Sequence, residues 1–222
     1  MVWVFWISVA GILTAYAGYP ALLALVASVR ARPVSARDIE PAVSILIAAH
    51  NEEESIGATL SNKLELDYPA GRLEIIVISD GSVDRTEEIV RGFSDRGVRL
   101  IVQNPRQGKT AGLNKAAAEA TGEILVFSDA NSMYRPDVLR RLMSNFADPA
   151  VGYVTGKMVY VDDSGSLIGS GCSAYMRYEN MLRNLETRVG SVVGVDGGVD
   201  AVRKSLYAPM SADLLPDFVL PL

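Results

Sequence analysis

The segment Glu123-Ile-Leu-Val-Phe-Ser128 runs directly into Asp129-Ala130-Asn131, and this stretch decides the fold. A continuous apolar run of this length, with Gly122 before it and polar residues after it, predicts a strand buried on both faces of a mostly parallel sheet. Such sheets bind ligands at the carboxyl ends of their strands. We therefore expect a ligand site where this strand ends.

Two oxygen-bearing side chains, Asp129 and Asn131, lie one residue apart at the end of this predicted strand. In an extended segment alternate side chains point to the same side, and hard oxygen donors suit Mg²⁺ or Mn²⁺. The competing interpretation is an Asx turn that closes the strand, because Asp and Asn are both common turn residues. The other strand ends, considered below, favour the metal site.

Composition limits the classes of function. The 222 residues leave room for a membrane segment and one α/β domain of ordinary size. A formal net charge of −5 and a pI near 5.0 argue against a nucleic-acid partner, whose phosphates require a basic face. The single cysteine, Cys172, excludes an intramolecular disulfide. With one histidine, His50, any chemistry must depend on carboxylates, lysine or a metal ion.

Residues 1–29 carry no charge and are predicted to form a transmembrane helix, with a kink at Pro20. At roughly 40 Å this helix would exceed the roughly 30 Å hydrocarbon core, so we expect it to tilt or to leave its ends uncovered. A cleaved signal peptide fits less well, because the stretch is too long and has no basic start. The basic linker 30–41 predicts a cytoplasmic location for the domain of residues 42–222, at a plasma or inner membrane.

Strand-like apolar runs alternate with helical patterns from residue 42 onwards. This alternation predicts an α/β domain, with a parallel sheet, helices on both faces and right-handed crossovers. Asn51 with Glu54, and Asp84 with Glu87, have the spacing of capping boxes at two helix starts. The expected strands are 43–49, 73–79, 98–103, 124–128 and 151–161. The expected helices are 52–66, 84–93, 110–120, 136–146 and 166–189, followed by a Gly-rich segment, a short strand and a short helix to residue 206.

Acidic residues follow two other predicted strands at the same expected edge, in His50-Asn51-Glu52 and in Ser79-Asp80-Gly81-Ser82. Clustered carboxylates repel one another and lose solvation unless a metal or a hydrogen-bonding ligand offsets both costs. Asp80 alone could simply cap the next helix. Because Glu52 and Asp129 are expected at the same edge, we expect Asp80 to contact a ligand.

Five segments resemble, in order and spacing, the family 2 glycosyltransferases, and in particular the membrane-bound enzymes related to cellulose, hyaluronan and poly-N-acetylglucosamine synthases. The resemblance covers residues 41–222 and implies a Rossmann-like fold of the GT-A type. Each segment alone is a weak signal, whereas five in order are a strong one. The segments are Val43-Ser-Ile-Leu-Ile-Ala-Ala-His-Asn-Glu52, Ile78-Ser-Asp-Gly-Ser-Val-Asp-Arg-Thr86, Gly108-Lys-Thr-Ala-Gly-Leu-Asn114, Phe127-Ser-Asp-Ala-Asn131 and Asp217-Phe-Val-Leu-Pro-Leu222.

The resemblance also implies roles for the residues that bind the donor. His50, Asn51 and Glu52 would line the nucleoside pocket, and Asp80 would contact the base or the ribose. Lys109 would reach the nucleotide or its diphosphate, a role that suits a mobile ammonium group on a Gly-flanked loop. The nucleotide expected from the family is UDP.

The same resemblance implies a metal ligand and a base. Asp129, with Asn131 in place of the family's second aspartate, would hold the divalent cation. Gly197 belongs to the Gly-rich loop beside the donor sugar and the acceptor. Asp217 would be the catalytic base, and Asp213 is the alternative because Pro216 stands where an acidic residue is common.

The predicted function is therefore a membrane-anchored, inverting glycosyltransferase that moves a sugar from a nucleotide sugar to a glycan or lipid acceptor. A divalent cation would neutralise the leaving diphosphate, and a carboxylate would take the proton of the attacking hydroxyl. The family's later Gln-x-x-Arg-Trp motif and further membrane helices are not in this sequence, so we expect it to be a fragment. The alternative function is a catalytically silent module that binds nucleotide sugars, and a nucleotide-cofactor oxidoreductase is more distant.

Overall fold

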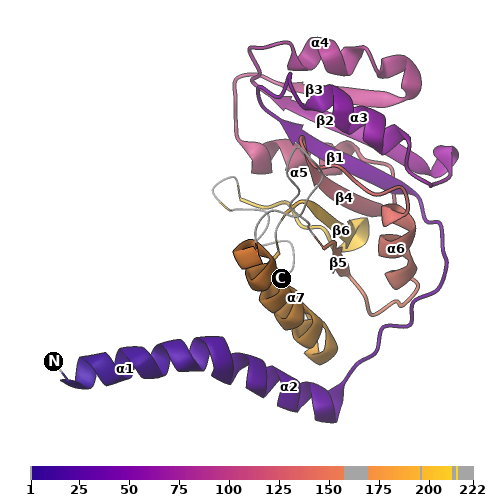
Figure 1. The fold of residues 1–222 in the computed structure, drawn as a ribbon. Coiled ribbons are helices and arrows are strands. Elements are labelled where there is room, and N and C mark those ends of the chain that lie inside the picture. The colour runs from indigo at the N-terminus through magenta and orange to yellow at the C-terminus, as the bar shows by residue number, and fades with distance from the viewer. Residues whose placement is uncertain (1, 158–169, 196, 212–213, 215–222) are drawn as a thin grey trace. The chain divides into compact units, whose positions relative to one another are not determined.

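The computed structural model describes residues 2–157, 170–195, 197–211 and 214. Its internal contacts divide the chain into two compact units. One unit comprises residues 1–33 and 159–194, and the other comprises residues 34–158 and 195–222. The larger second unit contains the sheet (Figure 1).

The second unit is built on a six-stranded sheet in the order β3-β2-β1-β4-β6-β5. The first four strands in this order are parallel, whereas β6 pairs antiparallel with both β4 and β5. The mostly parallel sheet predicted from the sequence is therefore confirmed. The strands are β1 Val43–Ala49, β2 Leu73–Asp80, β3 Val98–Gln103, β4 Ile124–Asp129, β5 Tyr153–Thr155 and β6 Val199–Arg203.

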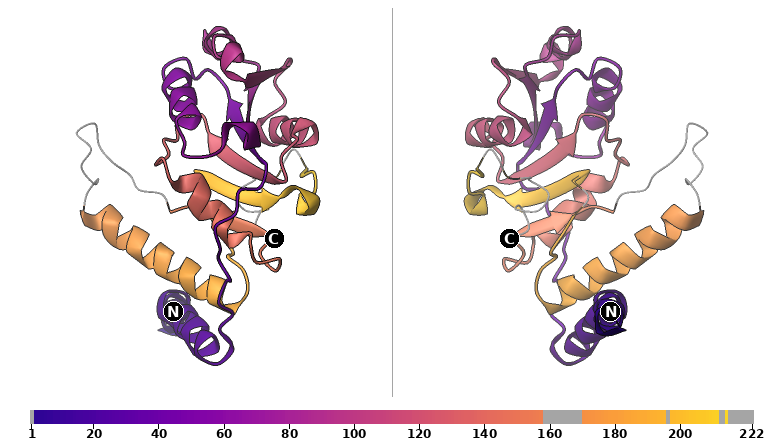
Figure 2. Two further views of the ribbon diagram at one scale, coloured as in Figure 1. Left: turned by 90° about the vertical axis from the view of Figure 1, so that its right-hand side faces the viewer. Right: turned by 90° about the vertical axis from the view of Figure 1, so that its left-hand side faces the viewer.

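Helices cover both faces of this sheet (Figure 2). Helices α3, α4 and α6 contribute to a core on one face, with Ile56, Val90 and Leu139 among its buried residues, and α5 contributes Leu113 to the core on the other. Because both faces are covered, β1 and β4 are buried along almost their whole length, as their continuous apolar sequences predicted. The helices are α3 Ile56–Leu64, α4 Thr86–Arg91, α5 Lys109–Glu119 and α6 Val138–Asn145.

The predicted capping boxes are wrong in their details. Helix α3 begins at Ile56, four residues later than predicted, because Asn51 adopts a left-handed conformation (φ 56°) that a helix start cannot use. At α4, Asp84 does accept a hydrogen bond from the Thr86 amide at 3.0 Å, as a cap would. Glu87, however, accepts a hydrogen bond from the Ser79 hydroxyl at 3.1 Å. The predicted strand 151–161 is described only at β5 and partly lies outside the described residues.

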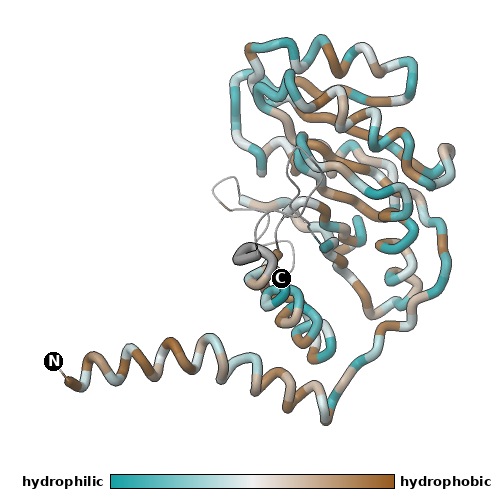
Figure 3. The backbone as a smooth tube through the Cα atoms, viewed as in Figure 1, coloured by the Kyte–Doolittle hydropathy of each residue, from teal (hydrophilic) through white to brown (hydrophobic). Residues whose placement is uncertain are grey.

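The first unit contains one continuous helix, Val2–Arg30, made of α1 Val2–Leu13, a π-helical turn Thr14–Gly18 and α2 Tyr19–Arg30. It is long and apolar enough to cross a membrane and is coloured apolar along most of its length in Figure 3. Helix α7, Ser170–Val189, packs against α2 in this unit. The π-helical turn ends two residues before Pro20, which has no amide hydrogen to donate within the helix, and both features are common causes of helix distortion.

Candidate functional site

The carboxyl ends of the three central strands lie at one edge of the sheet. In the strand register, Ala49 at the end of β1 pairs with Ser79, and Ala48 pairs with Asp129 at the end of β4. Asp80 and Asp129 therefore flank the first strand-to-helix turn on its two sides. The predicted convergence of these strand ends is confirmed, because parallel strands present their carboxyl ends to the same edge.

Asp80 is buried, with only 5% of its side chain exposed, and its carboxylate accepts three hydrogen bonds from the protein. Its Oδ1 atom accepts hydrogen bonds from the Gln103 side chain at 2.7 Å and the Gln107 amide at 2.8 Å. Its Oδ2 atom accepts one from the Gly108 amide at 2.8 Å and lies 3.7 Å from Arg106 Nε. Burial by itself raises the pKa of Asp80, but these donors outweigh it and hold the pKa below its ordinary value.

The contacts of Asp80 fix the loop that leads into α5. Gly81 follows with φ 67°, and a Cβ atom there would lie 2.9 Å from Arg106 Cβ, so only glycine fits this close approach. Gly108, with φ 96°, turns the chain into α5. Oδ2 accepts only one of these hydrogen bonds, so it keeps a lone pair for the predicted contact of Asp80 with a base or ribose, which remains a prediction.

The first turn is tied to the second by hydrogen bonds. His50 Nδ1 donates to the Asp80 carbonyl at 2.8 Å, which fixes this nitrogen as the protonated one because a carbonyl can only accept. Asn51 Oδ1 accepts from the Val83 amide at 2.9 Å. The left-handed conformation of Asn51 is of the kind that concentrates at ligand-binding sites. Glu52 is less available, because its carboxylate accepts from the Ser55 hydroxyl at 2.7 Å.

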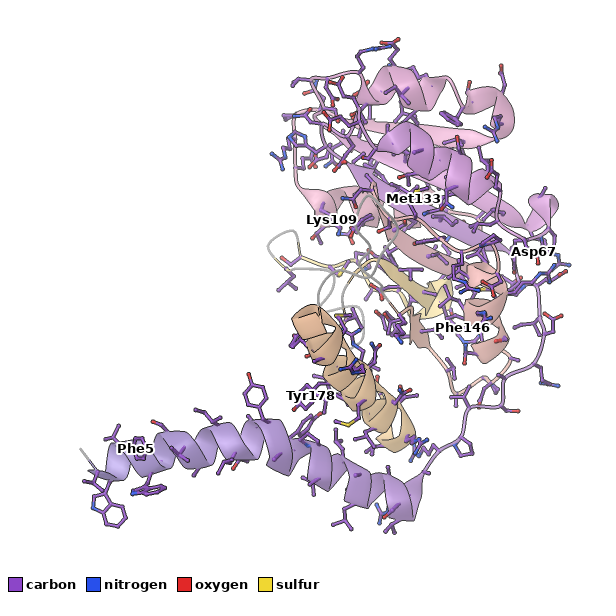
Figure 4. The ribbon with its side chains drawn as sticks, viewed as in Figure 1. Phe5, Asp67, Lys109, Met133, Phe146 and Tyr178 are labelled. Carbon is purple, nitrogen blue, oxygen red and sulfur yellow. The ribbon has the colours of Figure 1, made fainter. Side chains whose placement is uncertain are left out.

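Asp129 and Lys109 form an accessible ion pair at the same edge. Lys109 Nζ lies 2.8 Å from Asp129 Oδ1, and the two side chains are 43% and 35% exposed. Lys109 is the first residue of α5 and is labelled in Figure 4. One oxygen of Asp129 thus meets a cation while the carboxylate remains open to solvent, in contrast to the closed environment of Asp80.

The prediction that Asp129 and Asn131 point the same way rested on an extended backbone, and that premise is wrong. Strand β4 ends at Asp129, and the Ser132 amide donates to the Asp129 carbonyl at 3.3 Å across a tight turn. Asn131 lies in this turn and is exposed. The chain therefore does turn here, but the printed bond joins backbone groups, whereas an Asx turn would be closed by the side chain of Asp129. A turn and a metal-binding carboxylate are compatible at the same residues.

The Gly-rich segment is placed only in part. Gly197 is buried with φ 72°, and the next carbonyl, that of Gly198, accepts a hydrogen bond from the Tyr134 hydroxyl at 3.2 Å. This contact connects the Gly-rich segment to the chain that follows β4. Asp217 and its alternative Asp213 lie outside the described residues, so their predicted role as base stays a prediction.

Sequence reasoning missed two groups of side chains that hold the loops of the site. On α5, the Asn114 side-chain amide donates to the Met210 carbonyl at 2.7 Å and accepts from the Met210 amide at 3.0 Å. On α3, Thr59, Asn62 and Lys63 bond the segment that follows β4. Buried polar residues on a helix face that packs on a sheet were the signal available, because such groups need partners.

The side chains at this edge can be compared with the ligands that a divalent cation requires. Among the residues described, no group of three or more His, Cys, Asp or Glu side chains could hold a metal ion. The partly exposed carboxylate of Asp129 is the oxygen donor that we consider for a cation at this edge. Mg²⁺ is commonly held by one or two carboxylates together with substrate phosphates, so this donor set fits a cation that binds with a diphosphate.

Residues 44–206 match the model of the family "Glycosyl transferase family 2". The chain belongs to this family of glycosyltransferases. Among curated proteins, it is 37% identical over 134 residues to a probable glycosyltransferase, YdaM, of Bacillus subtilis, covering 58% of this chain and 32% of the relative. It is 30% identical over 165 residues to the poly-beta-1,6-N-acetyl-D-glucosamine synthase of Staphylococcus aureus, covering 73% and 40%. The chain thus spans about a third to two fifths of the length of these relatives.

Solved structures agree with the family assignment. The mannosyltransferase PcManGT from Pyrobaculum calidifontis, in complex with GDP-Man and Mn²⁺, superposes with a TM-score of 0.75 at 26% identity, over 94% of this chain and 60% of that protein. A fragment of TarS from S. aureus, in complex with UDP-GlcNAc, superposes with a TM-score of 0.51 at 20% identity, over 60% and 38%. The second likeness shows the shared fold alone. The GT-A fold inferred from the sequence is confirmed.

Proposed function

We propose that this chain carries the donor site of a membrane-anchored, inverting glycosyltransferase that uses a nucleotide sugar. The observation that carries the proposal is the exposed pair of Lys109 and Asp129, 2.8 Å apart, at the carboxyl edge of a family 2 domain. A cation and a carboxylate left open at this edge suit a ligand that brings both phosphate charge and a metal ion.

In the proposed site, Asp129 would hold a Mg²⁺ or Mn²⁺ ion, and Asn131 would help to orient it. When bound, this cation offsets the charge that develops on the departing diphosphate. Lys109 leaves its ion pair and contributes its own positive charge to the diphosphate. A relative in structure binds GDP-Man together with Mn²⁺, which supports a site of this kind.

The nucleoside part of the donor would lie at the first turn, formed by His50, Asn51 and Glu52. His50 presents its ring edge there, because its Nδ1 atom is already committed to the Asp80 carbonyl. Asp80 supports this pocket from inside by fixing the loop before α5. Gly197 would face the sugar and the acceptor.

The transfer itself is a single in-line displacement. The acceptor oxygen forms a bond to the anomeric carbon while the bond from that carbon to the diphosphate oxygen breaks, and the electron pair leaves with the nucleoside diphosphate. The proton of the acceptor hydroxyl passes to the Asp217 carboxylate, a contribution of about 10²–10⁴ in rate. One displacement with one base inverts the configuration at the anomeric carbon.

The membrane part of the proposal rests on the helix Val2–Arg30, which is long and apolar enough to span a bilayer. Arg30, Arg32 and Arg37 follow its apolar stretch and favour a cytoplasmic location for the sheet domain, where nucleotide sugars are available. The acceptor would be a glycan or a lipid-linked sugar at the membrane.

Calorimetry with UDP- and GDP-linked sugars, with and without Mn²⁺, tests the donor site, and a product assay tests transfer. We expect Asp217→Asn to abolish transfer while nucleotide binding changes less than about twofold, because the amide cannot accept a proton. Unchanged turnover in this variant would contradict the role of Asp217. Mn²⁺-dependent binding without transfer or donor hydrolysis in the unmodified chain would favour the silent binding module instead.

A further inference from the structure

Three polar side chains share one face of α3, at the positions of Thr59, Asn62 and Lys63. Residues three and four apart lie on the same side of a helix, so this spacing forms one polar patch. Thr59 and Lys63 are completely buried. A helix face that packs on a sheet is normally apolar, and buried polar groups cost stability unless they are bonded.

Each of these side chains bonds the backbone of the segment that follows β4. The Thr59 hydroxyl donates to the Ala130 carbonyl at 2.7 Å, and Lys63 Nζ donates to the Ser132 carbonyl. Asn62 donates to the Tyr134 carbonyl at 2.9 Å and accepts from the Tyr134 amide at 2.7 Å. Lys63 also lies over the Tyr134 ring, 3.3 Å from its centre.

The bonded segment is the one that presents the proposed metal ligands. It begins one residue after Asp129 and includes Asn131, which itself lies between two of the bonded carbonyls. Side chains of α3 thus bond four backbone groups of residues 130–134, three carbonyls and one amide, and these bonds fix the conformation of the turn. Apolar side chains on α3 could fill the same space, but they could not fix the direction of these carbonyls.

We propose that Thr59, Asn62 and Lys63 are positioning residues that hold residues 130–134 so that Asp129 and Asn131 face the divalent cation of the donor. The inference rests on the proposed function, because it assigns these side chains to the same site. Metal and substrate ligands must be held within about 0.5 Å of their working geometry, and the groups behind them commonly set the affinity.

The experiment uses the full chain and measures the Mn²⁺ concentration that gives half-maximal nucleotide binding. We expect Thr59→Val and Asn62→Leu to raise this concentration about tenfold while binding without metal stays unchanged, since second-layer partners of metal ligands contribute about 10–100-fold. Thr59→Ser keeps the hydroxyl and should restore the unmodified value. Hydrogen exchange of the amides of residues 129–134, measured without metal, should be faster in both variants.

The matched control is Ser44→Ala at the start of β1. Ser44 is also completely buried, and its hydroxyl accepts from the Gly122 amide at 2.9 Å, at the opposite end of the strands. This variant should lose stability but keep the Mn²⁺ requirement. If Thr59→Val lowers the melting temperature as Ser44→Ala does and leaves the Mn²⁺ requirement unchanged, the three side chains are merely structural and the inference is wrong.

Two further outcomes separate this inference from the proposed function. If Asn62→Leu does not fold, Lys63→Met and Thr59→Val supply the same measurement from other bonds of the patch. If the unmodified chain binds nucleotides with no dependence on Mn²⁺, the metal site fails and the positioning role fails with it. A Mn²⁺-dependent unmodified chain with unaffected variants overturns the positioning role alone.

Discussion

Asp80 and Asp129 end two strands of the same parallel sheet, yet their surroundings are opposite. Asp80 is almost fully enclosed and accepts three hydrogen bonds, two of them from backbone amides of the loop before α5. Asp129 is about one third exposed and forms an ion pair with Lys109. An acidic residue at a strand end can thus either hold a neighbouring loop or remain accessible to a ligand. Its role depends on how many hydrogen-bond donors surround it.

The largest effect is expected at Asp129, the open carboxylate. Asp129→Asn keeps the shape of the side chain but removes the charge that a cation requires. We expect Mn²⁺-dependent nucleotide affinity to fall about 100-fold, because a metal contact contributes several kcal/mol. The free energy of unfolding should change by less than about 1 kcal/mol, since an exposed ion pair stabilises little. Calorimetry and urea denaturation measure the two quantities.

Asp95→Asn, on an exposed 3₁₀ turn, is the matched control for the loss of one charge. It should alter neither quantity. If Asp129→Asn destabilises the fold strongly and leaves the Mn²⁺ dependence intact, Asp129 is a structural residue like Asp80 and the contrast between them disappears.

The second change addresses Asp80, where the expected effect is on stability. Asp80→Asn places an amide nitrogen against donors that need an acceptor, which should cost about 2–3 kcal/mol at pH 7. The pKa of the folded carboxyl is lowered, so its contribution is present above the unfolded pKa of about 3.9 and is lost as the pH falls through the lower, folded value. The gap in unfolding free energy between Asp80→Asn and the unmodified chain should therefore narrow below about pH 4.

Urea denaturation at pH 7, 5 and 3 measures this gap, and Asp95→Asn again serves as the exposed control. A gap that stays constant down to pH 3 would mean that the charge of Asp80 does not hold the loop. Nucleotide affinity should also be measured in folded Asp80→Asn. If Asp80 contacts the base or ribose directly, this variant will lose affinity as well as stability.

The smallest expected effect is at Lys109, the partner of Asp129. Lys109→Met should lower nucleotide affinity about tenfold at low salt and less at high salt, because an exposed charge is screened. Stability should change by less than about 1 kcal/mol. Lys115→Met removes an exposed cation from the same helix and is the matched control for isothermal titration at both salt concentrations. Tighter nucleotide binding in Lys109→Met would indicate that the ion pair competes with the donor.

Several elements followed from local patterns. The bounds of β1 and β3 agree with the predicted 43–49 and 98–103. Strand β1 is buried and shows as an apolar run, whereas the edge strand β3 has exposed residues between buried ones. The start of α3 was predicted four residues too early, since Asn51 has the chemistry of a cap but is held by the Val83 amide from another loop. The side chains of Thr59, Asn62 and Lys63 looked like ordinary helix residues, and their partners come from a segment about seventy residues later.

The amino-acid sequence was sufficient to predict the fold class, the order of strands and helices along the chain, the family, and the sheet edge where polar residues gather. These features depend on hydrophobic periodicity and on short motifs, which are local in the chain. The folded structure was needed to show that Asp80 is enclosed, that Asp129 is open, and that α3 holds the turn after β4. Burial and hydrogen bonding depend on partners distant in sequence, such as the Gln107 amide that meets Asp80, and no local pattern contains them.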